Sequence, residues 1–264
     1  MAKQKGPNKM IGFIDGKIYY MMNGEYYVRN PSSASKNKIN NDPAYSSTKN
    51  NAKEFGTATA IGSMFKKSFG SCIDHLSDKD LYRRINGLFN KLIHRGKGEE
   101  GKRSVELKAN KELFLDFQFK EEVNFNYLFK APYTLTVDED RKRIALSIPT
   151  FKASSGVSKV QGATHFRIIL SVLVFSDYLF DINQNKYLPV EPTINRLCIP
   201  EFSDLKSLDG TKDAITLAVQ LNVNNMVPDA VGLVTCIAIE FYQESAGRPY
   251  LLEMMSCMKI ADVF

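Results

Sequence analysis

The hydrophobic residues of this chain change their spacing near residue 104, from a helical repeat to strict alternation. Beyond that point apolar and polar residues alternate in 112–120 and 133–151, while 164–181 and 232–244 are almost wholly apolar. Alternation with a period of two is typical of strands with one buried face, and a long apolar run indicates a strand buried on both. No helical crossover pattern separates these segments, so an antiparallel sandwich or barrel is predicted rather than a parallel sheet.

We therefore predict an antiparallel β-sandwich domain over residues 105–264, with about seven or eight strands. Turn signals between successive segments give the strand limits. The predicted strand segments are 112–120, two within 133–151 joined by 138–141, 164–181, 214–222, 232–244 and 248–264, the last two joined at 245–247. The expected core residues are Phe117, Leu135, Ile144, Leu146, Phe166, Ile168, Leu170, Val172, Leu217, Val219, Ile237, Ile239 and Phe241.

A helical region is predicted over residues 47–104. The first helix should begin near Ser46 and end at Gly70, a residue type that commonly follows a helix. The second should run from Asp78 to His94, with Ser77 as its N-cap, and it carries a clear apolar stripe. The fold class expected is thus α+β.

Residues 1–46 are predicted to form an N-terminal arm. The segment 10–29 has two apolar and aromatic runs around Asn23-Gly24, the strongest short-range signal for a β-hairpin. Residues 1–9 should be a loose tail or an arm that becomes ordered on contact, and the polar segment 30–46 an extended linker. Fully extended, its 17 residues would span about 50 Å, enough to reach an adjacent subunit.

Four tyrosines distinguish the predicted hairpin. Tyr19 and Tyr20 are neighbours in one run, and Tyr26 and Tyr27 are neighbours in the other, so each pair places one ring on each face. A platform for nucleic-acid bases needs its aromatic side chains on one face, whereas a ribbon apolar on both faces favours protein on both sides. We expect these tyrosines and Arg29 to form a self-assembly site, with packing against the chain's own helices as the alternative.

Charge is distributed unevenly along the chain. The net charge is +6, but residues 1–110 hold 20 Lys and Arg against 10 Asp and Glu, and residues 111–264 hold 15 against 19. Opposite charges on the two halves would orient neighbouring copies, while a basic half also suits an anionic partner. Nucleic-acid binding by the first 110 residues is therefore the alternative function, with candidate contacts at Lys17, Arg29, Lys66, Lys67, Arg83 and Arg84.

No catalytic, metal or cofactor motif is evident in the sequence. The three histidines lie in different predicted elements, no phosphate-binding glycine loop has the required spacing, and the paired carboxylates fall in polar turns. The four cysteines form no C-x-x-C pair and are expected to be buried free thiols. These residues are His75, His94, His165, Cys72, Cys198, Cys236 and Cys257. We predict a protein that is not an enzyme and has neither metal nor cofactor.

Four stretches of sequence occur together between Gly16 and about Glu244. They are G-K-I-Y-Y…N-G-E-Y-Y-V-R, N-D-P-A-Y-S-S-T-K-N-N-A-K-E-F-G, G-A-T-H-F-R-I and E-F-Y-Q-E. In this combination the chain resembles an uncharacterised group of proteins from Bacteroidota-type bacteria. The resemblance implies a cytoplasmic origin and a small helical region followed by a β domain, and it implies no catalytic residues because the group has no settled activity.

These features favour a structural subunit that assembles with copies of itself through its arm, as in a filament, a tube or a phage-like particle. The first residues contain no apolar segment of signal-peptide length, and no run of apolar residues is long enough for a transmembrane helix. The expected location is the cytoplasm, with release or export as part of an assembly left open. A hydrolase with an inconspicuous site and carbohydrate binding by the sandwich also stay open.

Overall fold

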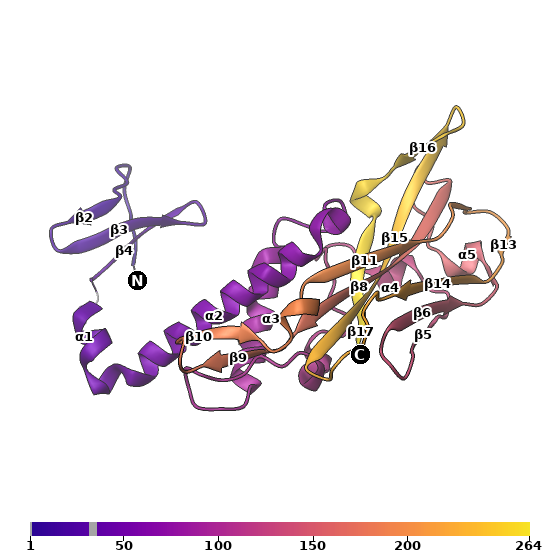
Figure 1. Cartoon of the computed structure of the whole chain (residues 1–264). Coiled ribbons are helices and arrows are strands. Elements are labelled where there is room, and N and C mark those ends of the chain that lie inside the picture. Colours follow the sequence, from indigo (N-terminus) through magenta and orange to yellow (C-terminus); the bar gives the residue numbers. More distant parts are fainter. Residues whose placement is uncertain (1, 32–35) are drawn as a thin grey trace. The chain divides into compact units, whose positions relative to one another are not determined.

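The computed structural model describes residues 2–31 and 36–264, and the contacts within it divide the chain into two compact units, Met1–Asn50 and Asn51–Phe264. Figure 1 shows both units with most of their helices and strands labelled. In the described part of the chain, no helix has the length and apolar character needed to cross a membrane.

The first unit contains a four-stranded antiparallel sheet, here named the arm sheet. Its strands are β1 (Ala2–Lys3), β2 (Gly12–Ile14), β3 (Lys17–Met22) and β4 (Glu25–Arg29), in the order β1-β4-β3-β2. The predicted hairpin is confirmed, because Asn23 and Gly24 turn the chain with φ of 52° and 77°. Of the two alternatives for residues 1–9, the loose tail is wrong, because β1 pairs with β4 and the side chain of Gln4 donates to the carbonyls of Met10 and Tyr27.

The prediction of an extended linker over residues 30–46 is also wrong for most of its length. Helix α1 spans Lys36–Asn41 and the 3-10 helix η1 spans Pro43–Tyr45, while residues 32–35 lie outside the described residues. The side chain of Asp42 accepts a hydrogen bond from the Ala44 N–H and Pro43 occupies the first turn, which is a favourable start for a helix. Because a helix rises only about 1.5 Å per residue, the span of this segment is shorter than the extended estimate.

Two long helices follow. Helix α2 spans Ser46–Ser68, as predicted, and the 3-10 helix η2 (Gly70–Ile73) leads toward α3 (Leu81–Arg95). The predicted start of α3 at Asp78 with a Ser77 cap is wrong. The carboxylate of Asp78 instead accepts hydrogen bonds from the Arg84 guanidinium (2.8 Å) and the Glu121 N–H (2.7 Å), which holds this segment outside the helix.

The second unit is built around a six-stranded antiparallel main sheet. Strands β8 and β15 form its centre and pair over twelve residues each, from Val231 opposite Ser176 to Tyr242 opposite His165. The prediction that 164–181 contains a central strand is confirmed, although β8 ends at Ser176. The hairpin of β15 and β16 projects beyond the rest of the sheet (Figure 1). The strands are β11 (Leu197–Phe202), β12 (Lys206–Ser207), β8 (His165–Ser176), β15 (Val231–Ser245), β16 (Arg248–Leu251) and β17 (Cys257–Val263).

A smaller three-stranded sheet packs on one face of the main sheet, which confirms a sheet-rich C-terminal region. Its strands are β14 (Ile215–Gln220), β6 (Arg143–Ile148) and β5 (Thr134–Val137). Ile144 and Leu146 share a core with Ile168 and Ile237 of the main sheet. The predicted core residues are all buried except Phe117 and Leu135, which are half-buried.

The opposite face of the main sheet packs against α2 and α3, so the second unit has three layers rather than the two of a plain sandwich. The ring of Phe65 in α2 contacts Phe175 of β8 and Phe89 of α3, each at a centroid distance of 5.2 Å. Ile169 of β8 and Cys236 of β15 belong to the same core. This arrangement explains why β8 and β15 are apolar at successive positions, since both of their faces are covered.

The alternating segment 112–120 is not a strand, contrary to prediction. The 3-10 helix η3 (Lys108–Leu113) occupies its start, and Asp116 adopts a left-handed φ of 59°. The segment still donates backbone hydrogen bonds to β17, from Asp116 to Ile260 and from Phe119 to Met258, both at 2.9 Å. Its alternating phenylalanines reach the core from an irregular backbone, because the left-handed residue interrupts the ladder.

The remaining elements are short. Strands β9 (Tyr178–Asp181) and β10 (Lys186–Pro189) form a hairpin, and β7 (Phe151–Lys152) pairs with β13 (Thr211–Lys212). The sequence analysis gave no strand at β10, β11, β12 or β13. The short helices are α4 (Phe125–Leu128), α5 (Ala153–Gly156), η4 (Pro192–Ile194) and η5 (Glu253–Met255).

Candidate functional site

The arm sheet carries apolar side chains on both faces. Residues directly opposite on paired strands point to the same face, so the strand register assigns each side chain. The pairs Phe13–Ile18, Tyr20–Tyr27 and Met22–Glu25 define the first face. The first face thus presents Phe13, Ile18, Tyr20, Met22 and Tyr27, and the second presents Ile14, Tyr19, Met21, Tyr26 and Val28.

None of the described strand residues in the arm sheet is buried. Phe13 is 69% exposed, Ile11 in the preceding loop 64%, and Met21 54%. A small sheet owes its stability to a hydrophobic face or to packing against a helix. Exposed apolar residues on both faces of one small sheet therefore mark it as an interaction surface.

The sequence-predicted assembly residues lie together in this sheet. Tyr20 and Tyr27 stack across the strands with ring centroids 5.9 Å apart, and the Arg29 guanidinium lies 6.0 Å from the Tyr20 centroid. Tyr19 and Tyr26 lie on the other face, as the alternation predicts. All four tyrosines are half-buried by their neighbours.

The most exposed apolar side chains of the arm sheet are not the tyrosines. Sequence reasoning missed Phe13 and Met21 in this role. The turn at Asp15-Gly16, with φ of 48° and 72°, is the same type of signal as Asn23-Gly24 and would have revealed β2 and Phe13. Strand β2 also forms an edge of the sheet, so one side of its backbone is open to pairing with another strand.

The candidate nucleic-acid residues do not gather into one site. Lys17 and Arg29 lie in the first unit, whereas Lys66, Lys67, Arg83 and Arg84 lie on α2 and α3 in the second. Arg84 donates to Asp78 and to the carbonyls of Gln118 and Phe119, and Arg83 lies near Asp80 and Glu121.

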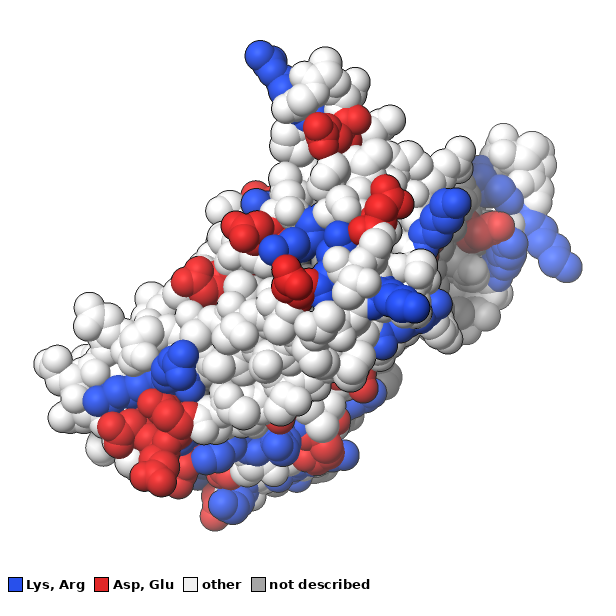
Figure 2. Space-filling model, turned by 90° about the vertical axis from the view of Figure 1, so that its right-hand side faces the viewer, with Lys and Arg blue, Asp and Glu red and all other residues white. Residues whose placement is uncertain are grey.

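Many basic groups of the first 110 residues are paired with acids. At least eight described Lys and Arg side chains of that half lie within ion-pair distance of a carboxylate. On the side of the molecule drawn in Figure 2, basic and acidic side chains are intermixed rather than joined into one basic surface. Neutralised cations offer less to a phosphate backbone, whose binding depends on free positive charge.

Away from the arm sheet, a cluster of polar side chains surrounds the buried carboxylate of Glu240 in β15. The Oε2 atom accepts hydrogen bonds from Arg167 Nε (2.8 Å) and from the Tyr242 hydroxyl (2.6 Å), and His75 Nε2 lies 2.5 Å from Oε1. Burial and then the bond to Glu240 raise the pKa of Tyr242. Each group has a partner, so the cluster acts as a buried network that joins the loop before α3 to the main sheet.

The remaining histidines and the cysteines are dispersed. His94 lies in the last turn of α3 and bonds to the Asn90 carbonyl, and His165 begins β8. Cys236 and Cys257 are buried free thiols as predicted, whereas Cys72 and Cys198 are half-buried. In the described ranges no group of three or more His, Cys, Asp or Glu side chains is placed to hold a metal ion.

Comparison with known proteins gives no relative from which a function could be transferred: no family model, no curated protein and no solved structure matches this chain.

Proposed function

We propose that this protein is a structural subunit that assembles with copies of itself and that the arm sheet is the connecting element. The single observation that carries the proposal is a separate small sheet with apolar side chains on both faces and no buried strand residue. Contact with a second molecule would remove these side chains from water, which is the main driving force of protein association.

Two modes of contact are available to the arm sheet. Its faces offer aromatic and methionine side chains, which are common at protein interfaces. Its edge at β2 offers unpaired backbone groups over Gly12–Ile14, which a strand of a neighbouring subunit can extend. Face contacts would supply most of the affinity, and edge pairing would set the orientation.

The test compares the untagged full chain with a variant that lacks residues 1–30. Size-exclusion chromatography with light scattering and negative-stain electron microscopy should show large ordered objects for the full chain. The truncated chain should be a folded monomer, because its main core lies wholly within residues 51–264. A full chain that stays monomeric, or a truncated chain that assembles equally well, would contradict the proposal.

The full chain should also be mixed with a single-stranded oligonucleotide at low ionic strength. Nucleic-acid binding by the basic half predicts an affinity that falls steeply as salt is added. Assembly through apolar faces should instead persist or strengthen in salts such as sulfate. These opposite responses distinguish the two functions in one set of measurements.

A further inference from the structure

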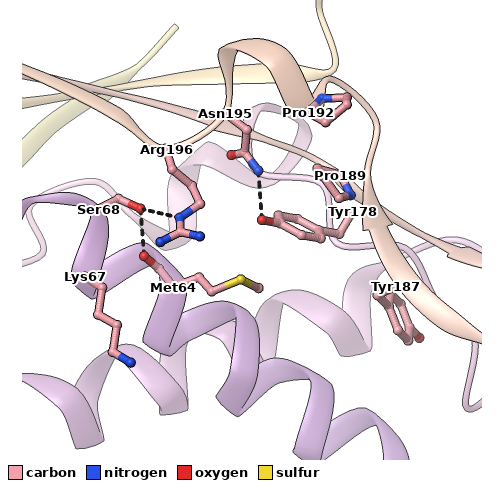
Figure 3. A pocket seen from close by; sticks show the side chains of 9 residues that line it. All are labelled: Met64, Lys67, Ser68, Tyr178, Tyr187, Pro189, Pro192, Asn195 and Arg196. Atoms are coloured by element: carbon pink, nitrogen blue, oxygen red, sulfur yellow. Dashed lines mark hydrogen bonds between the residues drawn. The ribbon is translucent and has the colours of Figure 1, made fainter.

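A pocket of about 540 Å³ lies in the second unit, between the last turns of α2 and the segment from β9 to the start of β11. Figure 3 shows the side chains that line it. Pockets of roughly 300–1,000 Å³ are typical of small-molecule sites. None of its residues takes part in the arm sheet, and Lys67 is the one lining residue that the sequence analysis named.

Two hydrogen-bond donors face one another across this pocket. The guanidinium of Arg196 and the hydroxyl of Tyr178 point toward one another in Figure 3. Asn195 Nδ2 donates to the Tyr178 oxygen at 2.9 Å, which leaves the hydroxyl proton available for a ligand. The Ser176 N–H donates to Asn195 Oδ1 at 3.0 Å, so the amide that orients Tyr178 is itself fixed. Burial raises the pKa of Tyr178, and its hydroxyl is therefore a donor at neutral pH.

The pocket carries positive charge without a compensating acid. Lys67 and Arg196 line it, and no Asp or Glu does. In the part of the chain that the structure describes, neither cation lies within 4.0 Å of a carboxylate. Among the described residues the Arg196 side chain donates a hydrogen bond to the neutral Ser68 hydroxyl alone, at a long 3.4 Å. Arg196 and Lys67 are exposed at an open pocket, and an unpaired guanidinium there favours an anion, which it can bind through two parallel donors.

The backbone at Arg196 supports the same conclusion. Its φ of 70° lies in the left-handed region, which is uncommon for residues other than glycine. The Arg196 N–H donates to the Val174 carbonyl at 2.8 Å, which fixes this conformation at the start of β11. A conformation held against its intrinsic preference is often found where a side chain must be aimed at a ligand.

The other walls of the pocket are apolar. Met64 of α2, Pro189 of β10 and Pro192 of η4 line it, together with the ring of Tyr187. We propose that this pocket binds a small organic anion, namely a carboxylate or phosphate monoester carried on a flat apolar body. The anionic group lies between Arg196 and Tyr178, and the apolar body lies against Met64. Lys67 lies at the edge of the pocket, with its ammonium group directed away from Arg196 and Tyr178 in Figure 3.

The probe for a test is phenyl phosphate, which combines the two features, with phenol as the matched compound that lacks the anion. Binding to the full chain is followed by saturation-transfer NMR on the ring protons, and dissociation constants are taken from titration rather than from signal strength, which varies with particle size. Phenyl phosphate should bind saturably, and phenol should bind at least about tenfold more weakly, because a hydrogen bond to a charged group contributes about 1.5–3 kcal/mol.

Three variants and a control assign the contacts. Arg196→Asn keeps a residue type that tolerates a left-handed φ and should weaken phenyl phosphate about tenfold or more. Tyr178→Phe should weaken it several-fold, and Lys67→Gln, an exposed change that leaves the fold intact, should do so slightly. Arg248→Asn on the exposed strand β16 is the control and should bind like the unaltered chain.

Three results would overturn the proposal. They are the absence of saturable binding by phenyl phosphate, equal binding of phenol, and unchanged affinity in both Arg196→Asn and Tyr178→Phe. None of these results bears on assembly through the arm sheet, which is measured separately by particle size.

Discussion

Replacing Phe13 by threonine is expected to weaken the proposed self-association by two to three orders of magnitude. Phe13 lies on the first face of the arm sheet and is 69% exposed in the single chain. A phenylalanine side chain buries roughly 150–250 Å² when fully covered, so roughly 100–170 Å² remain for a partner to cover. At about 25 cal/mol per Å² this corresponds to about 2.5–4 kcal/mol for each contact. A change of that size alters the dissociation constant about 100- to 1,000-fold.

Threonine is chosen because it favours strands, so the change removes apolar area without opposing β2. The matched control is Ile182→Thr. Ile182 follows β9 in the second unit, is 73% exposed, and lies outside the arm sheet. Any loss of assembly in this control would point to a general effect of surface hydrophobicity.

Sedimentation velocity over a hundredfold range of protein concentration measures both variants against the unaltered chain. We expect the Phe13→Thr chain to remain monomeric at concentrations where the other two assemble. The reasoning is refuted if Phe13→Thr associates within about threefold of the unaltered chain, or if Ile182→Thr weakens association equally.

Three further changes test the fold by thermal and urea unfolding. Gly96→Ala should destabilise the fold by about 1–3 kcal/mol or more, because the new Cβ would lie 1.8 Å from the backbone oxygen of Ser104. Gly87→Ala, in a helix and facing open space, should instead stabilise the fold by up to about 1 kcal/mol. Equal effects of the two changes would contradict this reasoning. Burial raises the pKa of Asp177 from 3.8 to about 7, so between these pH values the folded state holds a proton that the unfolded state has released. The free energy of unfolding therefore falls by up to about 4 kcal/mol as the pH rises from 4 through 7. Asp177→Asn should therefore raise the melting temperature at pH 8 and change it little at pH 4, and a gain at both pH values would count against the assignment. Glu240→Gln should lower the free energy of unfolding by about 3–5 kcal/mol, because it breaks a buried charge network. Glu244→Gln is the control: the Glu244 carboxylate is 47% exposed, and its loss should change stability by under about 0.5 kcal/mol. Similar losses in the two variants would show that the buried network does not stabilise the fold more than an exposed pair does.

Local signals in the sequence determined the elements whose formation depends on neighbouring residues. Asn23-Gly24 forms a two-residue turn because asparagine and glycine both tolerate positive φ, and in Ala246-Gly247 the glycine does so while Ala246 is held at a φ of 51°. The apolar stripe of α3 and the unbroken apolar run of β8 likewise correctly indicated which of their residues are buried. The antiparallel character of the second part followed from the absence of crossover segments.

Tertiary contacts determined the structure of the segments that the sequence pattern predicted wrongly. The segment 112–120 has the period of a strand, yet a ladder also needs a regular partner, and the left-handed Asp116 interrupts its pairing with β17. Strand β11 has a weak pattern of its own and exists because β8 offers it an open edge. Helix α3 begins at Leu81 rather than at Asp78, because the Asp78 carboxylate accepts a hydrogen bond from the Arg84 guanidinium instead of taking part in a helix N-terminus.

The sequence by itself determined the hairpin of tyrosines, the two long helices and a sheet-rich second half, since each depends on residues within a few positions of one another. Only the tertiary structure decided that the helices cover the second face of the main sheet and that Arg196 faces Tyr178 across a pocket. Such juxtapositions join residues distant along the chain, and no local spacing encodes them, because they arise from the packing of whole elements.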